Sequence, residues 1–371
     1  MTTVRHHMVN ESNGVYYFLG NVTSHVVHAL PLYEQLGGTI VVLSNRARDE
    51  LAAQGVPSIA IDDRPDEFLK LSRHLGDTID YLDQHAKVVV FYEMFLLPRQ
   101  LRNSGCTKIF LWHGNALKSF MTMNRMRQRA VKGYDYIASL GPINRARLID
   151  EQGFDPGQLV DIGIARTDEV VRHRGQVVVS PDLIAETGID PARKIVSYVP
   201  TYWGVSSIHT LGKKIVAGFP DEHTLIFRPH PQTPTDLLDE YTDLIGDRPN
   251  IVYAPHGRYE HVGLLETLDA SSLIIGDVSS VMLEAILLDK PLLFARDPGG
   301  ADEDDLRPIH ELVERAGQID ASNVGALAQI LDQTMRRGID HDVWEQTKDA
   351  MFFHHDGTSV AAIKEFVESQ L

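Results

Sequence analysis

Short runs of apolar residues alternate along this chain with longer segments in which apolar residues recur every three or four positions. The runs predict buried strands, and the periodic segments between them predict helices. Strands are expected at residues 15–19, 39–43, 58–61, 87–91, 108–111, 136–139 and 160–163, and again at 194–199, 224–227, 250–253, 272–275 and 291–295. This order is typical of parallel sheets joined by crossover helices, and therefore of an α/β fold.

An irregular stretch, residues 170–191, separates the two series and is predicted to be a linker with a short helix. The 371 residues are enough for two domains with separate cores. We expect two Rossmann-like domains, residues 1–175 and 190–345, that face one another across a cleft. The final segment, residues 346–371, is helical in pattern and is expected to pack back across both domains.

The formal net charge of −16 argues against a nucleic-acid partner, because such binding depends on cations that neutralise phosphates. The single cysteine excludes an internal disulfide. No zinc spacing, EF-hand loop, P-loop or dinucleotide fingerprint is present, so we expect no metal and no cofactor. No signal peptide opens the sequence, and no apolar run is long enough to span a bilayer, which predicts a cytoplasmic protein.

One basic stretch departs from this acidic composition. Its cations are Lys118, Arg125, Arg127, Arg129 and Lys132, with methionine and phenylalanine interleaved and no acidic residue among them. Such a stretch is typical of a surface that meets anionic lipid or a polyanionic acceptor, here at the inner face of the cell membrane. An ordinary solvated helix with a buried methionine face explains the pattern equally well.

A histidine follows the predicted strand at 108–111. The sequence Trp112-His113-Gly114 leaves the His113 imidazole with little steric cover at the carboxyl end of that strand, where open α/β folds bind ligands. Imidazole is the side chain best suited to proton transfer near neutral pH. The alternative is a histidine that is hydrogen-bonded inside its loop.

A second group of polar residues follows the strand at 272–275. Asp277, Ser279 and Ser280 stand between that strand and the helical pattern at 281–288, so the serines are expected at a helix N-terminus. The unpaired N–H groups and the dipole there favour a phosphate. The alternative is that Asp277 or Ser279 merely caps the helix.

Two further strands of the second series end in comparable residues. Arg228 and His230 follow the strand at 224–227, and Thr201 follows the strand at 194–199. Because the carboxyl ends of parallel strands meet at one edge of a sheet, these residues are expected near the serines. We expect Asp277 to cap or orient its neighbours rather than to bind a metal, since a single carboxylate is a poor Mg²⁺ site.

Six segments between residue 110 and the C-terminus resemble, in the same order, the motifs of the CDP-glycerol glycerophosphotransferases of teichoic acid synthesis. The family motifs are Trp-His-Gly-Thr-Pro-Leu-Lys, Gly-x-Pro-Arg-x-Asp, Pro-Thr-aromatic, Arg/Lys-x-His-Pro, Asp-Tyr-Ser-Ser followed by Lys-Pro, and an Asp-Gly segment followed by Ser. The corresponding segments here are Trp112–Lys118, Gly163–Asp168, Pro200–Tyr202, Arg228–Pro231, Asp277–Pro291 and Asp356–Ser359.

The chain departs from these motifs at several positions. Asn115 and Ala116 replace Thr-Pro, Ala165 replaces Pro, Val278 replaces the aromatic residue, and Trp203 stands where an Arg is common. These changes leave the residues of the nucleotide-phosphate site in place and bear on the acceptor and on the transferred group.

The resemblance implies a GT-B fold and an enzyme that moves glycerol phosphate or ribitol phosphate from a CDP-polyol. The acceptor would be a hydroxyl of a cell-wall or capsule polymer or of a lipid-linked precursor, and CMP would be released without a metal. His113 would accept the proton of that hydroxyl, and His230 is the second implied catalytic residue. The residues implied for the donor phosphates and nucleotide are Thr201, Arg166, Arg228, Asp277, Ser279 and Ser280.

Three other functions remain open from the sequence. The His-Pro and Ser-Ser pair is similar to the one with which bacterial sialyltransferases hold CMP, so a glycosyltransferase that uses a CMP-sugar or UDP-sugar is the first. A UDP-sugar 2-epimerase is disfavoured by the scarcity of carboxylates near the histidine motifs. A non-enzymatic nucleotide sensor or scaffold is the third, and it would not need His113.

Overall fold

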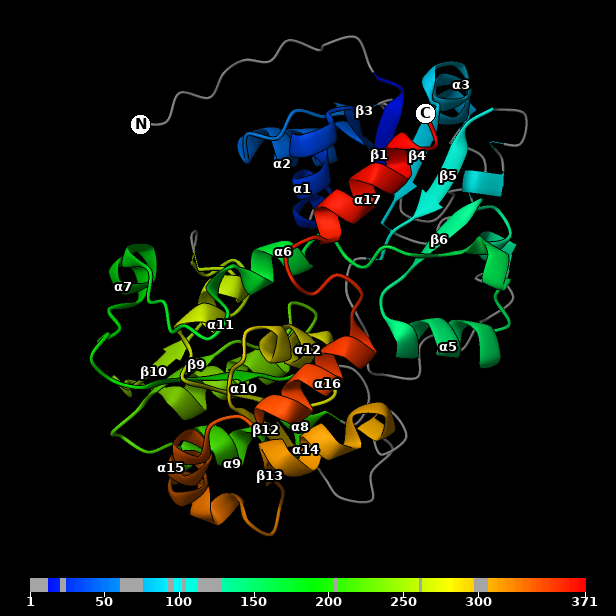
Figure 1. The fold of residues 1–371 in the computed structure, drawn as a ribbon. Helices are drawn as coiled ribbons and strands as arrows, with labels where there is room; N and C mark the ends of the chain where they lie inside the picture. The colour runs from blue at the N-terminus through cyan, green and yellow to red at the C-terminus, as the bar shows by residue number, and fades with distance from the viewer. Residues whose placement is uncertain are drawn as a thin grey trace. The chain divides into compact units, whose positions relative to one another are not determined.

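The computed structural model describes residues 13–20, 25–60, 76–92, 97–99, 101, 105–112, 129–202, 206–259, 262–296 and 306–371. These residues form two compact units, each built on a parallel sheet (Figure 1). The first unit contains the described residues up to 112, together with 129–169 and 351–371. The second unit contains the described residues from 170 to 350.

The sheet of the first unit has seven strands in the order β3-β2-β1-β4-β5-β6-β7. Their bounds are β1 Val15–Gly20, β2 Thr39–Val42, β3 Ile59–Ala60, β4 Val88–Phe91, β5 Thr107–Phe110, β6 Tyr136–Ser139 and β7 Leu159–Asp161. Every residue of the central strands β1 and β4 is buried. A parallel sheet is covered on both faces, so its central strands appear in the sequence as continuous apolar runs.

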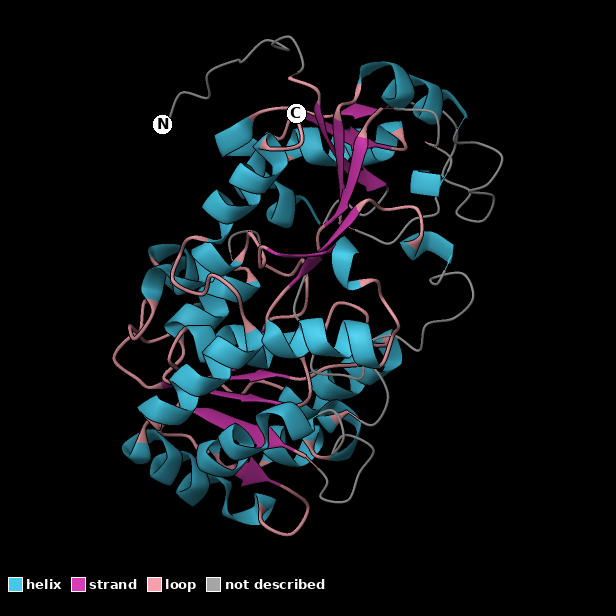
Figure 2. Cartoon of the chain, turned by 45° about the vertical axis from the view of Figure 1, so that its right-hand side comes forward, coloured by secondary structure: helices cyan, strands magenta, loops and turns pink. Residues whose placement is uncertain are grey.

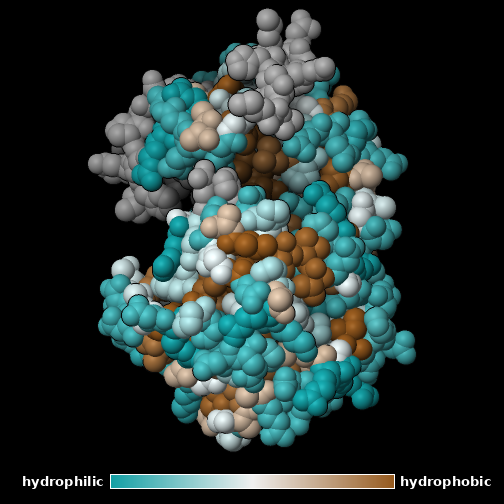
Figure 3. Space-filling model, turned by 90° about the vertical axis from the view of Figure 1, so that its left-hand side faces the viewer, coloured by the Kyte–Doolittle hydropathy of each residue, from teal (hydrophilic) through white to brown (hydrophobic). Residues whose placement is uncertain are grey.

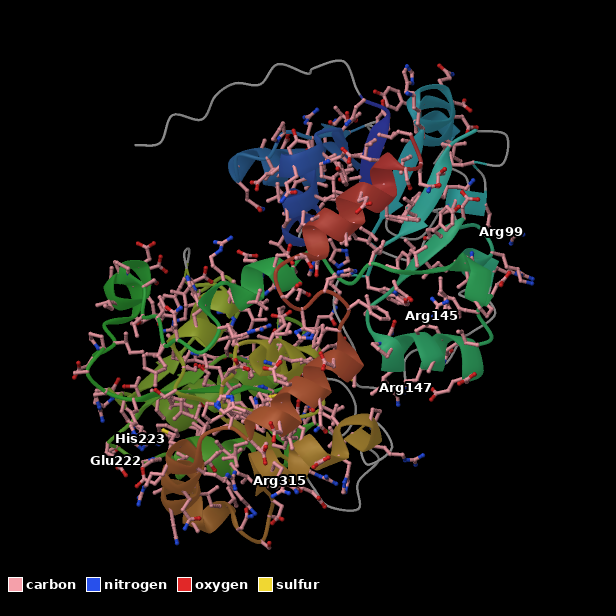
Figure 4. All side chains as sticks on the ribbon, in the orientation of Figure 1. Arg99, Arg145, Arg147, Glu222, His223 and Arg315 are labelled. Atoms are coloured by element: carbon pink, nitrogen blue, oxygen red, sulfur yellow. The ribbon has the colours of Figure 1, made fainter. Side chains whose placement is uncertain are left out.

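The helices of this unit are α1 Val26–Leu36, α2 Asn45–Ala53, α3 Gly76–His85, α5 Pro142–Asp150, α6 Thr167–Val170 and α17 Ser359–Glu368. Short 3₁₀ turns lie at Leu97–Arg99 and Pro156–Gln158. Helix α17 comes from the far end of the chain and packs against α1 (Figure 1). On α5, Arg145 forms an ion pair of 2.9 Å with Asp161 at the end of β7 (Figure 4).

The sheet of the second unit has six strands in the order β10-β9-β8-β11-β12-β13. Their bounds are β8 Ile195–Val199, β9 Thr224–Phe227, β10 Ile251–Tyr253, β11 Leu273–Gly276, β12 Leu292–Ala295 and β13 Gln318–Ile319. Successive side chains along each strand point to opposite faces of the sheet. Tyr198, Phe227 and Tyr253 stack in one core, whereas Ile226 and Val252 belong to a second core.

The helices of the second unit are α7 Pro181–Thr187, α8 Ser207–Thr210, α9 Gly212–Ala217, α10 Thr235–Ile245, α11 Leu264–Ala270, α12 Ser280–Leu287, α14 His310–Ala316, α15 Leu327–Arg337 and α16 His341–Met351. Short 3₁₀ turns lie at Val171–His173, Arg307–Ile309 and Val324–Ala326. Figure 2 shows helices on both faces of this sheet. The expectation of two α/β series with parallel sheets is therefore confirmed.

Strand β13 has no counterpart among the predicted strands. It contains two residues and lies at the edge of its sheet. A strand this short does not produce a run of apolar residues in the sequence. The predicted linker does contain a short helix, α7, which Ser180 caps by accepting a hydrogen bond of 3.1 Å from the Leu183 N–H. Residues 170–180 belong to the second unit.

Hydrophilic side chains cover much of the face that Figure 3 shows. Of the large apolar side chains in the described segments, Val27, Val177 and Leu371 are the exposed ones. No helix in the described part of the chain is both long and apolar enough to cross a bilayer.

Candidate functional site

Polar residues gather at the carboxyl ends of three adjacent strands of the second unit. Strand β8 lies between β9 and β11, and all three run parallel and in register. The chain leaves β8 toward β9 and β10 and then returns to β11 on the other side. The strand order therefore reverses between β8 and β11, and such a reversal is where open α/β sheets bind their ligands. The predicted residues Thr201, Arg228, His230, Asp277 and Ser279 follow these three strands.

The Asp277 carboxylate joins the segment after β11 to the segment after β8. The side chain is 3% exposed. One oxygen accepts a hydrogen bond of 2.9 Å from the Thr201 N–H. The other accepts bonds of 2.9 Å from the Ser207 N–H and 2.8 Å from the Ser207 hydroxyl. The geometry supports an orienting role for Asp277, since its oxygens bind protein donors, and Ser207 is a partner that the sequence did not reveal.

Ser279 occupies the N-cap position of α12 but does not cap the helix. Its backbone is extended, and within the described residues the buried Oγ has no hydrogen-bond partner. The alternative that Ser279 serves only as a helix cap is therefore wrong. A buried hydroxyl without a partner beside the free N–H groups of a helix start is suited to an anionic ligand.

Arg228 supplies a cation on the neighbouring strand end. One guanidinium nitrogen donates a hydrogen bond of 3.0 Å to the Val262 carbonyl, which fixes the side chain. Burial lowers the pKa of Arg228 below its ordinary value, while the charge of Glu266 raises it. The pKa of a guanidinium is so high that this side chain stays cationic at neutral pH.

His230 lies in a tight turn directly after Arg228. The His230 carbonyl accepts a hydrogen bond of 2.9 Å from the Thr233 N–H, and Pro231 occupies the second position of the turn, where its fixed φ fits. The Gln232 N–H donates to Nδ1 of the imidazole at 3.1 Å. Since Nδ1 accepts, the neutral ring carries its proton on Nε2.

The Tyr202 ring stacks on this imidazole. The ring centroids lie 4.4 Å apart and the planes differ by 26°. Tyr202 entered the sequence reasoning only as the aromatic residue of a motif, and the contact depends on the adjacency of β8 and β9.

Other motif residues fix the structure of the first unit. The Trp112 indole N–H donates a hydrogen bond of 2.6 Å to the Ala138 carbonyl, which anchors the segment directly before His113. The Asp168 carboxylate caps α17 by accepting bonds of 2.8 Å and 2.9 Å from the N–H groups of Ser359 and Val360. The Gly163–Asp168 segment thus meets the C-terminal motif, which explains why the two occur together.

Several predicted residues are not placed at this strand edge. Arg166 belongs to the first unit. His113, Lys118, Arg125 and Arg127 lie outside the described residues. Of the basic stretch, the structure describes the two exposed cations Arg129 and Lys132.

The described residues contain no group of three or more histidine, cysteine, aspartate or glutamate side chains that could hold a metal ion. At the strand edge of the second unit the structure places a guanidinium, an imidazole, hydroxyls and backbone N–H groups. Such groups bind phosphates.

Comparison with known proteins identifies the family. Residues 73–368 match the family described as CDP-Glycerol:Poly(glycerophosphate) glycerophosphotransferase. The chain belongs to this family. The predicted family is thereby confirmed.

The teichoic acid glycerol-phosphate primase of Bacillus subtilis (strain 168) is similar over 233 residues, with 29% identity. The match covers 58% of this chain and 56% of the relative, so it spans little more than half of either protein.

Solved structures show the same fold. The wall teichoic acid polymerase TagF is 16% identical, with a TM-score of 0.63 over 96% of this chain and 88% of that one. A putative UDP-N-acetylglucosamine 2-epimerase from Listeria monocytogenes is 12% identical, with a TM-score of 0.64 over 96% and 97% of the two chains. The predicted GT-B type of α/β fold is confirmed.

Proposed function

We propose that this protein transfers glycerol phosphate from CDP-glycerol to an acceptor hydroxyl and releases CMP. The observation that carries the proposal is the buried Ser279 hydroxyl at the start of α12, which has no hydrogen-bond partner among the residues that the structure describes and lies on the same sheet edge as Arg228 and His230. Family membership supports the choice of donor. A solved structure of the TagF polymerase carries the description of a soak with CDPG.

In this proposal the donor pyrophosphate lies against the first turn of α12. The helix N–H groups and the Ser279 hydroxyl donate hydrogen bonds to its oxygens, and the positive end of the helix dipole favours its charge. Arg228 neutralises part of that charge, and charge-assisted hydrogen bonds of this kind are the strong ones. Asp277 keeps the Thr201 backbone beside them.

The reaction is a displacement at phosphorus. The acceptor oxygen forms a bond to the phosphorus that carries glycerol, and the bond from that phosphorus to the bridging oxygen of the pyrophosphate breaks. CMP leaves with the bridging oxygen and its electron pair. The Nε2–H of His230 donates to the negative charge that develops there, and such preorganised donors are a main source of rate in phosphoryl transfer.

We assign removal of the acceptor proton to His113. The assignment is supported by its place in the Trp-His-Gly motif and by the anchored Trp112 before it. A neutral imidazole is a base of suitable strength at neutral pH. His113→Ala should abolish CMP release while leaving the affinity for CDP-glycerol nearly unchanged.

The acceptor is proposed to be a hydroxyl of a cell-wall or capsule polymer or of its lipid-linked precursor, and CDP-ribitol is an alternative donor. Because a lipid-linked acceptor would lie at a membrane, we also propose that residues 118–132 contact an anionic membrane. The support is five cations without an acidic neighbour in a chain of net charge −16. Flotation with vesicles of anionic lipid, repeated at high salt, tests the contact.

Donor binding tests the site most simply. Ser279→Ala should lower the affinity for CDP-glycerol about tenfold, because a hydrogen bond to a charged group is lost. The matched control is Ser272→Ala, which changes a serine at the opposite end of β11 and should leave the affinity unchanged. Titration calorimetry measures both variants. Equal affinities for the two variants, or tight binding of a UDP-sugar instead, would contradict the proposed site.

A further inference from the structure

We propose that Tyr202 is a positioning residue. It holds the imidazole of His230 in an orientation in which the Nε2–H can donate a hydrogen bond to CDP-glycerol. The inference rests on the proposed function in one respect, namely that the partner of this N–H is a phosphate oxygen. Its structural part, that Tyr202 and Gln232 together fix the ring, stands on the contacts alone.

The first constraint on His230 acts at its backbone and at Nδ1. The turn closed by the Thr233 N–H and the His230 carbonyl places the Gln232 N–H against Nδ1 at 3.1 Å. A donor at Nδ1 favours the tautomer with its proton on Nε2. Pro231 contributes because its ring fixes φ at the second position of the turn.

The second constraint is the stacked ring. Rotation of an imidazole about its χ2 torsion is only weakly restricted, so a hydrogen bond at Nδ1 does not by itself define the plane of the ring. The Tyr202 ring covers one face at 4.4 Å between centroids and 26° between planes. Rotation of the imidazole out of this plane would break the stack and weaken the bond at Nδ1 together.

The stacked tyrosine is itself anchored. The Thr201 N–H, one residue earlier, is bound to the buried Asp277 carboxylate at 2.9 Å. A continuous chain of contacts thus runs from Asp277 through the backbone of Thr201 and the Tyr202 ring to His230. It joins the segments after β11, β8 and β9, so the three strand ends that form the site also set the orientation of its histidine.

The experiment compares Tyr202→Phe, which keeps the ring, with Tyr202→Leu, which removes it. Nitrogen-15 NMR of histidine-labelled full-length protein without ligand reports the tautomer, and the His230 signal is assigned by its loss in His230→Gln. CMP release from CDP-glycerol gives kcat and KM. Tyr136→Leu, which removes a half-buried ring from the first unit, serves as the control.

We expect Tyr202→Phe to retain the wild-type His230 signal and kcat. Tyr202→Leu should shift the signal toward a mixture of tautomers and lower kcat about tenfold. An unchanged His230 signal in Tyr202→Leu, or an equal fall in kcat for Tyr202→Phe and Tyr202→Leu, would overturn the inference. If the wild-type protein releases no CMP from CDP-glycerol, the proposed function fails, and the NMR comparison still decides whether Tyr202 positions the ring.

Discussion

The hydrogen bonds that the Asp277 carboxylate accepts from two backbone N–H groups give the sharpest stability prediction. Asp277→Asn keeps the shape of the side chain but replaces one acceptor oxygen by an NH₂ donor, which faces the donors of Ser207 or Thr201. Each hydrogen bond to a charged group contributes about 1.5–3 kcal/mol. An amide nitrogen that faces Ser207 loses two bonds and should cost about 3–6 kcal/mol, whereas one that faces Thr201 loses one bond and should cost about 1.5–3 kcal/mol. The site is 3% exposed, so water does not replace the lost partners readily.

Urea unfolding of the full chain measures this loss, and hydrogen exchange of peptides that contain Thr201 and Ser207 shows where it acts. Exchange should accelerate there and stay unchanged in the first unit. Ser207→Ala keeps both backbone bonds to Asp277 and removes the hydroxyl's bonds to Asp277 and to the buried Tyr198 hydroxyl, so it should also lose stability, by about 1.5–4 kcal/mol. The control is Asp243→Asn, an exposed residue on α10, which should stay within about 0.5 kcal/mol. A loss for Asp277→Asn no greater than that of the control would show that the hydrogen bonds of the Asp277 carboxylate do not stabilise the fold.

Three further predictions concern stability. Burial lowers the pKa of Lys290 from 10.5 to about 8. Between pH 8 and pH 10.5 the unfolded chain therefore binds more protons at this residue than the folded protein does. The unfolding free energy should therefore rise by about 2 kcal/mol from pH 8 to pH 10 relative to Lys290→Met, and equal slopes in urea titrations would contradict this. Gly163→Ala at φ +67° places a methyl group 2.7 Å from a carbonyl oxygen and should lose more than about 2 kcal/mol. Gly175→Ala at φ +74°, with open space around it, should lose only about 1 kcal/mol by thermal melting. Asp168→Asn should lose about 1–3 kcal/mol and speed hydrogen exchange in the first turn of α17, whereas the exposed Asp150→Asn should do neither.

The parts of the site that follow from local pattern were predictable. An apolar strand, a short polar turn and a helical period placed Ser279 at the start of α12, and the structure puts the helix start at the next residue. The same reasoning brought Arg228 and His230 to the edge of the same sheet.

Contacts that depend on strand order were not predictable. Asp277 and Ser207 are 70 residues apart in the chain, and no periodicity links them. The Tyr202–His230 stack exists because β8 lies beside β9 in the sheet. The two-residue strand β13 was missed because so short a segment has no period to detect. The role of Asp168 at α17 required tertiary structure as well, since its partners are 191 and 192 residues away.

Phosphorus-31 NMR of the wild-type protein with CDP-glycerol and a polyol-phosphate acceptor follows the transfer of glycerol phosphate and the release of CMP in one experiment. We expect the pyrophosphate signals to disappear while the signals of a phosphomonoester, CMP, and of a phosphodiester grow in equal amounts. Formation of CDP would show that a carbon–oxygen bond breaks instead. Unchanged pyrophosphate signals from CDP-glycerol, with turnover of a CMP-sugar or UDP-sugar under the same conditions, would show that the protein is a glycosyltransferase and not a glycerophosphotransferase.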